Sequence, residues 1–459
     1  MRPSVWHPKL KRGDGPIHEQ LIETLSRDVA SGALAPGAQL PTQRDLAYAL
    51  KIGVGTVTKV YDEARRRGLL TAHVGRGSFV SGTIKMEQGD HPIDLFHNVV
   101  SHGAAPARLD AALQALRKRA DIGEHIGYAP PSGFAAHRQA GAEYLRDFIG
   151  FEVDWQRLVV CQGGQHAMAL VFSSLCRAGD IVLTEAATFA GMKTLAEQLG
   201  LRLRGLKMDE QGLMPDALDR AAASGAKVLY TIPTLQNPTG RFMSAKRRVE
   251  IAAVARRRSL TIVEDDIYAP FVPDAQRTEP LSALAPERSF HITSLSKAVA
   301  PGVRCGYIVT PDAGAFERIV RCVLALSYSP SSFGALIGTQ WIEDGGAQAI
   351  VASARRAVAE RMALACRILG SAIEGPHVPI APHVWLPMSD LEAERVAGRA
   401  LRQGVAVTPP AAPIVDASEI SGLRLCLGAP PDSATLERGL RIVQRALSDG
   451  PEAGLAAVV

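Results

Sequence analysis

One stretch decides the fold that we expect for this chain: Ser294-Leu295-Ser296-Lys297-Ala298-Val299-Ala300-Pro301-Gly302-Val303-Arg304. It follows Phe290-His291-Ile292-Thr293, which we interpret as the end of a buried strand. A strand that opens into a polar loop can place a lysine in a dry pocket, where its amine is a useful nucleophile. The two serine hydroxyls and the arginine are groups that bind a phosphate. The stretch therefore suggests a Schiff-base lysine beside a phosphate site, as pyridoxal phosphate (PLP) requires, with an ordinary surface lysine as the alternative.

The chain around this stretch alternates short apolar runs with helical stretches, a pattern typical of an α/β fold with a mostly parallel sheet covered on both faces. In such sheets, ligands bind at the carboxyl ends of the strands. The expected strands are Leu158–Cys161, Ile181–Thr184, Leu201–Leu206, Val228–Ile232, Thr261–Glu264, Phe290–Thr293 and Gly306–Val309.

Four further features follow separate expected strands in chain order. Gly163 and Gly164 open an expected helix, and the free main-chain N–H groups at the beginning of that helix can bind a phosphate. Phe189 is placed to stack on a flat ring, and the amide of Asn237 to reach a phenolic oxygen. Glu264-Asp265-Asp266 follows another strand, and a carboxylate buried at a strand end needs a cationic partner, such as a protonated pyridine nitrogen. Each feature alone is also compatible with packing or a turn, but their order together favours a PLP site.

The excess positive charge of the chain lies in its first fifth. Residues 1–83 hold 12 Lys and Arg against 7 Asp and Glu, which equals the net charge of +5 of the whole chain. A basic small module ahead of a neutral large one suggests a polyanion as its partner, and an ordinary solvated surface is the alternative.

The same region predicts a winged helix-turn-helix. Apolar residues from Ile17 to Val29 mark one face of a first helix. A second helix follows Thr42 as N-cap, and a third runs from about Thr56 to Arg67 after a Gly53-Val54-Gly55 turn. A hairpin then closes around residues 74–77. In this design the third helix enters the major groove and the wing touches the backbone or the minor groove.

Its motifs resemble the GntR family of bacterial transcription regulators over residues 12–82. They read Leu-Pro-Thr-Gln-Arg-Asp-Leu-Ala from residue 40, Thr-Val-x-Lys-x-Tyr from 56, Arg-Gly-Leu-Leu from 67 and Gly-Arg-Gly-Ser-Phe-Val from 75. Gly53-Val54 stands where that family usually has a pair such as Ser-Arg, so one polar contact is missing; a winged helix used only for protein contacts is the alternative. The resemblance implies DNA contacts from Gln43, Arg44, Thr56, Thr58, Lys59, His73 and Arg76.

Residues 96–450 resemble the fold-type I PLP enzymes of the aspartate aminotransferase superfamily. Beside the strand-end features, Tyr128 to Arg138 looks like the Tyr-x4-Gly-x4-Arg segment of that family, and Gly422 to Gly428 like its late arginine-bearing strand. Gln162-Gly163-Gly164 replaces the usual Ser-Gly-Ser or Ser-Gly-Thr, so one hydroxyl contact to the phosphate is lost. Residues 83–95 are expected to be a linker, and about 345–450 a small subdomain.

The resemblance also implies a role for each site residue. Lys297 would bond PLP, Asp265 would pair with the ring nitrogen, and Arg424 would bind the α-carboxylate of a ligand. Phe189 would stack on the ring, and Tyr128 would reach the phosphate from a second subunit. Asn237 and Tyr268 would hold the ring oxygen, and the phosphate would be held by Gly164, Gln165, Ser294, Ser296 and Arg304.

The bulk numbers indicate a globular protein of the cytoplasm. A chain of 459 residues is too long for one domain. Its six cysteines are scattered without C-x-x-C or a Cys/His cluster, which argues against a metal site and a disulfide framework. The N-terminus lacks an apolar signal core, and no apolar run is long enough to span a membrane.

Two unlike modules in this order resemble the MocR subfamily of GntR regulators. The resemblance implies a homodimeric, PLP-dependent transcription regulator that binds direct or inverted operator repeats. An amine or amino acid would displace Lys297 from PLP, form an external aldimine and so be sensed. The alternatives are a working aminotransferase with an accessory DNA-binding module, and a regulator that senses PLP itself or a vitamer.

Overall fold

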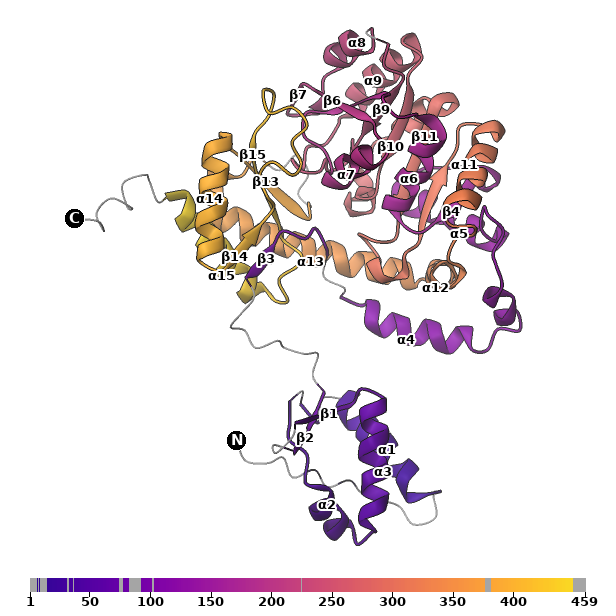
Figure 1. Ribbon diagram of the computed structural model, residues 1–459, viewed down its shortest axis with the longest axis vertical. Coiled ribbons are helices and arrows are strands. Elements are labelled where there is room, and N and C mark those ends of the chain that lie inside the picture. Colours follow the sequence, from indigo (N-terminus) through magenta and orange to yellow (C-terminus); the bar gives the residue numbers. More distant parts are fainter. Residues whose placement is uncertain are drawn as a thin grey trace, which may run out of the picture. The chain divides into compact units, whose positions relative to one another are not determined.

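The computed structural model describes residues 6, 8, 15–30, 33–35, 37–73, 77–81, 92–100, 103–223, 225–375 and 381–448. The chain divides into two compact units, Met1–His91 and Pro92–Val459. Each unit has its own core, and Figure 1 shows the elements of both. The multidomain fold expected from the sequence is confirmed.

The first unit is the expected winged helix-turn-helix. Its core gathers Leu21 and Leu25 of the first helix, Leu46 of the second, and Val57 and Tyr61 of the third, all of them buried. The spacing of these residues explains why each helix buries one face. The elements are α1 (Ile17–Ala30), α2 (Gln43–Leu50), α3 (Val54–Arg66) and an antiparallel hairpin of β1 (Leu70–His73) and β2 (Gly77–Val80).

The turn between α2 and α3 is shorter than we expected. The Thr42 hydroxyl caps α2 by accepting from the Asp45 amide at 3.2 Å, as predicted. Lys51 then ends α2 in the left-handed conformation, with φ of 54°. Gly53 is the N-cap of α3, which begins at Val54 and not near Thr56. Gly53 has the extended backbone typical of an N-cap residue, with φ of −66° and ψ of 139°, so the helix begins directly after it.

The second unit is built on a seven-stranded, mostly parallel sheet, as predicted. The strand order is β4-β12-β11-β10-β9-β5-β6, and only β12 runs antiparallel to its neighbours. The strands are β4 (Leu158–Cys161), β5 (Ile181–Glu185), β6 (Arg202–Leu206), β9 (Val228–Thr231), β10 (Thr261–Asp265), β11 (Ser289–Ser294) and β12 (Gly306–Val309).

Both faces of this sheet are covered, because neighbouring residues of one strand belong to different cores. Val182 packs in the larger core with α6 (Gly164–Leu175) and α7 (Ala190–Gln198). Its neighbour Leu183 packs in a second core with α8 (Pro215–Ala222) and α9 (Ala245–Arg257). Side chains alternate between the faces of a strand, so the two cores lie on opposite sides of the sheet (Figure 1).

The remaining helices and strands complete this unit. They include α4 (Ala105–Leu116), α5 (Ala135–Tyr144), α10 (Leu281–Leu284), α11 (Ala313–Leu326), α12 (Ser332–Glu343), α13 (Gly346–Leu369), α14 (Asp390–Arg402), α15 (Ser433–Ser448), β7 (Met208–Asp209), β8 (Gly212–Leu213), β13 (His383–Pro387), β14 (Val405–Val407) and β15 (Gly422–Cys426).

The C-terminal elements form a small layered region beside the sheet. β13 pairs with β15, and β14 pairs with a strand that we expected to lie in the linker, β3 (Ile93–Leu95). Leu95 is fully buried, which explains why these residues join the second unit. The chain therefore enters this unit as part of its structure from residue 93 onward.

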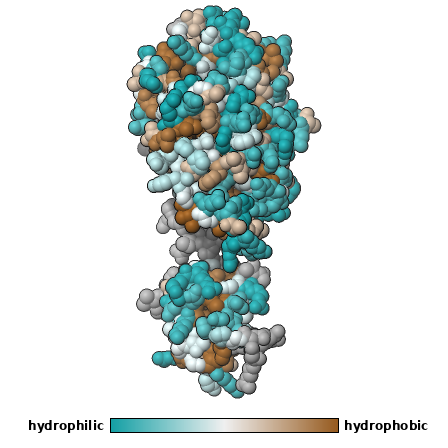
Figure 2. Space-filling model, turned by 90° about the vertical axis from the view of Figure 1, so that its right-hand side faces the viewer, coloured by the Kyte–Doolittle hydropathy of each residue, from teal (hydrophilic) through white to brown (hydrophobic). Residues whose placement is uncertain are grey.

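The helices of the described residues include none that is both long and apolar enough to cross a membrane. On the face drawn in Figure 2, hydrophilic and hydrophobic residues are interspersed. All six cysteines are free thiols.

Candidate cofactor site and DNA-binding surface

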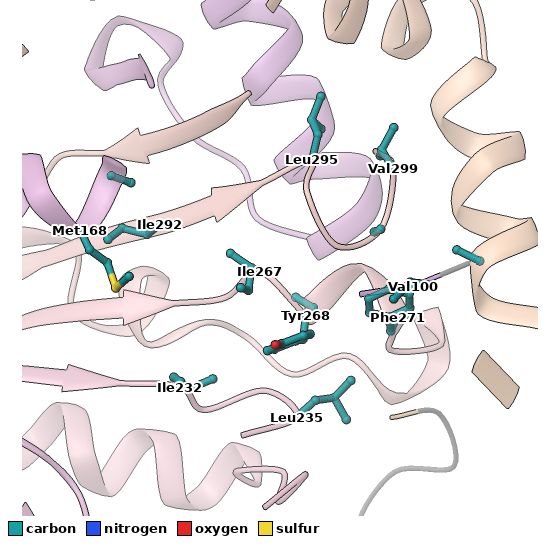
Figure 3. Packing of buried hydrophobic residues seen from close by; sticks show 14 of the residues in the cluster. Val100, Met168, Ile232, Leu235, Ile267, Tyr268, Phe271, Ile292, Leu295 and Val299 are labelled. Atoms are coloured by element: carbon teal, nitrogen blue, oxygen red, sulfur yellow. The ribbon is translucent and has the colours of Figure 1, made fainter. Parts of the chain in front are cut away.

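The parallel strands bring the predicted site residues to one edge of the sheet. β4 points in the same direction as β11, because each is antiparallel to β12. The carboxyl ends of β4, β5, β9, β10 and β11 therefore share an edge. Figure 3 shows the loop with Leu295 and Val299 leaving the strand of Ile292, and Ile267 and Tyr268 follow the adjacent strand.

Lys297 projects from this loop with its amine enclosed by the protein. Its Nζ donates a hydrogen bond to the main-chain carbonyl of Asn98 at 2.5 Å. Burial lowers the pKa of Lys297 to about 8, while the nearby Asp265 carboxylate opposes that shift. A substantial fraction of the amine is therefore neutral, and hence nucleophilic, near pH 8.

Asp265 ends β10 and is fully buried. The Tyr230 hydroxyl donates to its Oδ2 at 2.7 Å, whereas its Oδ1 has no hydrogen-bond partner among the described residues. Burial raises the pKa of Asp265 to about 6. A buried carboxylate oxygen without a partner is costly, so the geometry fits a cationic group such as a protonated ring nitrogen.

A hydrogen-bonded cluster joins the predicted ring-oxygen and carboxylate residues. Asn237 Nδ2 donates to the Tyr268 hydroxyl at 3.4 Å, and Arg424 Nη1 donates to Asn237 Oδ1 at 2.6 Å. Arg424 also donates through Nε to the Thr408 hydroxyl at 3.1 Å and through Nη2 to the Phe96 carbonyl at 3.2 Å. The guanidinium is thereby fixed in orientation, as bidentate recognition of a carboxylate requires.

Donors for a phosphate gather at the beginning of α6. Gly163 has φ of +85°, and a Cβ built on it would lie 3.0 Å from Arg304 Nη2. A Cβ on Gly164 would lie 4.0 Å from the hydroxyl of Ser294. The Ser296 hydroxyl is buried without a partner in the described part of the chain. Hydroxyls, a guanidinium and a helix N-terminus are together a suitable set for a phosphate.

Phe189 and Tyr128 make no hydrogen bond or ring contact with this cluster in the described part of the chain. Gln165 is expected to act through its main chain, which lies in the first turn of α6 next to Gly164, while its side-chain amide donates to the Gly191 carbonyl at 3.1 Å. Phe189 is half-buried as the N-cap residue of α7. Tyr128 is 82% exposed and contacts Tyr328 edge to face. Their roles in ring stacking and phosphate binding stay predictions.

Several residues of the cluster were not predicted from the sequence. Asn98 donates through Nδ2 to the Tyr268 hydroxyl at 2.9 Å and to His383 Nδ1 at 3.1 Å. Tyr230 lies inside a strand and Asn98 inside an irregular segment, where no motif marks them. Only the register of β9 against β10 brings Tyr230 to Asp265. His383 opens a short strand, and that polar residue in an apolar run was the one available signal.

A second polar cluster lies next to Asp265 and is not a convincing metal site. Glu264, Asp266 and His291 are close enough to hold one ion. However, the buried Arg248 donates to Glu264 at 3.3 Å and supplies positive charge itself. Glu264 further accepts from the Ser282 hydroxyl at 2.7 Å. We interpret this cluster as an ion-pair network that supports the end of β10.

Of the predicted DNA-binding residues, all but Arg76 lie on α2, α3 and β1 of the first unit. Arg44 and Lys59 are exposed and make no ion pair with the described residues. Thr58 donates to Gln43 Oε1 at 2.8 Å, which fixes the end of that side chain. Thr56 is half-buried on α3. His73 ends β1, but its side chain and all of Arg76 lie outside the described residues.

The three arginines at the end of α3 form ion pairs with acidic residues of this helix, so they are less available to bind DNA than their number indicates. Arg65 pairs with Asp62, and Arg66 and Arg67 both pair with Glu63. The unpaired positive charge on the described part of this unit therefore includes Arg44 and Lys59, two of the predicted contacts.

Comparison with known proteins agrees with this geometry. The family model described as aminotransferase class I and II matches residues 90–443, and the bacterial regulatory proteins, gntR family, match residues 17–80. The uncharacterized HTH-type transcriptional regulator YdeF of Bacillus subtilis is 29% identical over 459 residues, covering 97% of this chain and 98% of that protein. The pyridoxine biosynthesis regulator PdxR of Corynebacterium glutamicum is 26% identical, covering 64% and 66%.

Solved structures share the fold of the second unit. An archaeal alanine:glyoxylate aminotransferase superposes with a TM-score of 0.71 at 22% identity, covering 86% of this chain and 95% of that one. A kynurenine aminotransferase of Pyrococcus horikoshii gives 0.72 at 20% identity, covering 80% and 93%. Aminotransferases of this family use PLP, and the unpartnered Asp265 and Ser296 oxygens fit that cofactor. The chain belongs to the aminotransferase class I and II family and carries an N-terminal gntR-family DNA-binding domain, which is the architecture of MocR-type regulators.

Proposed function

We propose that this protein is a PLP-dependent transcription regulator whose second unit senses an amine or amino acid and whose first unit reads an operator. One observation carries the proposal. The lysine amine of lowered pKa and the fixed guanidinium of Arg424 lie in one hydrogen-bonded site, in a chain that begins with a DNA-binding unit. An amine-exchanging group and a carboxylate-binding group together select ligands that carry both functions.

Each polar group has a task in that site. PLP, when bound, supplies an aldehyde carbon that exchanges amines and a ring that withdraws electrons. The Asp265 carboxylate would hold a proton on the ring nitrogen, and Asn237 and Tyr268 would hold the ring oxygen. Ser294, Ser296, Arg304 and the amides of Gly164 and Gln165 would hold the phosphate. Lys297 would yield its place to the amine of the ligand, while Arg424 binds the carboxylate.

Two other functions use the same residues. Lys297 is also positioned to move a proton at the ligand's α-carbon, which supports a working aminotransferase as the second candidate. The relative named as a pyridoxine biosynthesis regulator supports a regulator that senses PLP or a vitamer. Arg424 favours an amino acid ligand over both PLP and a vitamer, because neither of those carries a carboxylate.

The sensor would act as a homodimer on direct or inverted operator repeats. Tyr128 and Tyr328 contact each other with ring centroids 4.9 Å apart, and both are exposed. Ile126, Leu326 and Phe333 add exposed apolar side chains near them in the sequence. A second copy would cover this surface and bring Tyr128 toward its phosphate site. Two DNA-binding units would then read half-sites about 34–36 Å apart, or multiples of that distance.

A spectral and DNA-binding screen tests the proposal. The purified full-length protein would be titrated with a panel of amino compounds, and its visible absorbance and its binding to the DNA upstream of its own gene would be followed together. A compound that changes both signals without release of a keto product supports the sensor. Catalytic release of keto product would support the aminotransferase, and a response to PLP alone would support the vitamer sensor. A protein without visible absorbance after incubation with PLP would refute all three.

A further inference from the structure

The first residues of the second unit lead directly from the linker into the cofactor site. The unit begins at Pro92, and β3 occupies Ile93–Leu95. Phe96 and Asn98 follow at once and contact the residues assigned above to the ligand. This segment is the first part of the second unit that the polypeptide enters after the DNA-binding unit.

Asn98 contacts the site through both its main chain and its side chain. Its carbonyl accepts from Lys297 Nζ at 2.5 Å, and its Nδ2 donates to the Tyr268 hydroxyl at 2.9 Å and to His383 Nδ1 at 3.1 Å. His383 Nε2 lies 3.0 Å from the Gln236 carbonyl and must donate to it. Burial lowers the pKa of His383 to about 3, so the ring is neutral and Nδ1 is the acceptor that fixes the Asn98 amide.

Phe96 contacts the other end of the site through its carbonyl. This oxygen accepts from Arg424 Nη2 at 3.2 Å and from the Cys426 thiol at 3.2 Å. Asp94 Oδ1 accepts from the amides of Phe96 and His97 at 2.8 and 3.0 Å. That turn, together with the pairing of β3 with β14, orients the Asn98 carbonyl toward Lys297 and the Phe96 carbonyl toward Arg424.

We propose that Phe96–Asn98 is a positioning segment that holds the Lys297 amine, the Tyr268 hydroxyl and the Arg424 guanidinium, and that it transmits their state to the chain leading to the DNA-binding unit. The transmission rests on the proposed function, whereas the positioning of Tyr268 and Lys297 does not. An amine that is bonded to a cofactor carbon has fewer N–H groups than a free lysine, so its hydrogen bond to Asn98 depends on the state of the site. A ligand carboxylate likewise competes with the Phe96 carbonyl for Arg424.

Hydrogen exchange of the PLP-loaded, full-length protein tests the transmission with two chemical probes. Hydroxylamine displaces the lysine nitrogen from the cofactor and returns Lys297 as a free amine, without oxidation or reduction. Aminooxyacetate does the same and adds a carboxylate for Arg424. Visible absorbance records that each probe has reacted. Amide exchange is then measured in a peptide covering residues 92–100, with a peptide from α9 as the internal reference.

The two probes should give different results in residues 92–100. Hydroxylamine should slow exchange there, because the freed lysine donates again to the Asn98 carbonyl. Aminooxyacetate should slow it less, because its carboxylate draws Arg424 from Phe96. Unchanged exchange in this peptide while absorbance shows complete reaction would overturn the transmission. A protein without cofactor absorbance would instead overturn the proposed function.

Replacement of the Asn98 side chain tests the positioning. Asn98→Ala should shift the pH midpoint of the cofactor absorbance, since the Tyr268 hydroxyl loses the nearer of its two amide donors, and should abolish the different responses to the probes. Gln139→Ala is the matched control, because Gln139 is an exposed amide side chain on α5, outside the positioning segment. An Asn98→Ala protein with the wild-type midpoint and wild-type exchange would overturn the proposal. If Asn98→Ala does not fold, Asn98→Ser decides by the same measurements, since serine is too short to reach both Tyr268 and His383.

Discussion

The two units of this protein present their functional groups in opposite ways. Arg44 and Lys59 of the DNA-binding unit stand on short helices and are exposed to water. Asp265 and Arg424 of the second unit are buried and fixed by hydrogen bonds. Exposed charges act mainly through long-range attraction that salt screens, whereas buried groups act through geometry and shifted pKa values. Substitutions should therefore have graded effects in the first unit and nearly all-or-none effects in the second.

The largest effect expected is that of Lys297→Ala. The variant should lose the visible absorbance of a lysine-linked cofactor completely and lose its response to amines, because no other described lysine is shown at this site. DNA binding without ligand should persist, since the first unit has its own core. Absorbance spectra and a gel-shift assay check both parts. Loss of cooperative unfolding instead would mean that the lysine is needed for the fold. The expected difference between the two units would then be contradicted.

The capture of PLP by the protein freed of cofactor should depend strongly on pH. With a pKa of about 8 for Lys297, the neutral fraction of the amine should increase about fiftyfold from pH 6 to pH 8 and only about twofold above pH 8. Protonation of Asp265 below its pKa of about 6 should slow capture further at the acidic end. Stopped-flow absorbance measures the rate. A rate that keeps rising to pH 10.5 would show that the amine is as exposed as an ordinary lysine.

Asp265→Asn should weaken PLP binding by about 1.5–3 kcal/mol, the usual contribution of a hydrogen bond to a charged group. Tyr230→Phe should weaken it less, by about 1 kcal/mol, because the Asp265 carboxylate and its charge remain in place. Titration of the cofactor-free protein with PLP, followed by absorbance, gives both constants. Equal effects of the two variants would contradict the direct role assigned to Asp265.

The smallest effect is expected in the DNA-binding unit. Lys59→Ala should weaken operator binding modestly and reduce the slope of log K against log salt by about 0.9, as for one phosphate contact. Lys246→Ala is the matched control, because Lys246 is an exposed lysine on α9 of the second unit and its loss changes the charge equally. Fluorescence anisotropy over a salt series measures the slope. A similar change in both variants would mean that net charge, and not a local contact, is responsible.

The sequence allowed the elements and most of the site to be predicted because both leave local patterns. A buried parallel strand is a short apolar run, and the groups that follow it share one edge of the sheet. Asp265, Lys297 and Arg424 could be named for this reason. Asn98, Tyr230 and His383 could not, because they lie far apart in the sequence and in segments without a motif.

The sequence by itself determined the order of the two units, the strand ends that carry the site and the basic character of the first unit. These are properties of nearest neighbours along the chain, which local periodicity and charge record. Tertiary structure alone decided that Asn98 meets Lys297 and that β3 joins β14. Such contacts depend on the register and burial of segments that are distant in the sequence. They therefore stabilise the protein only after the whole chain has packed, and no local pattern records them.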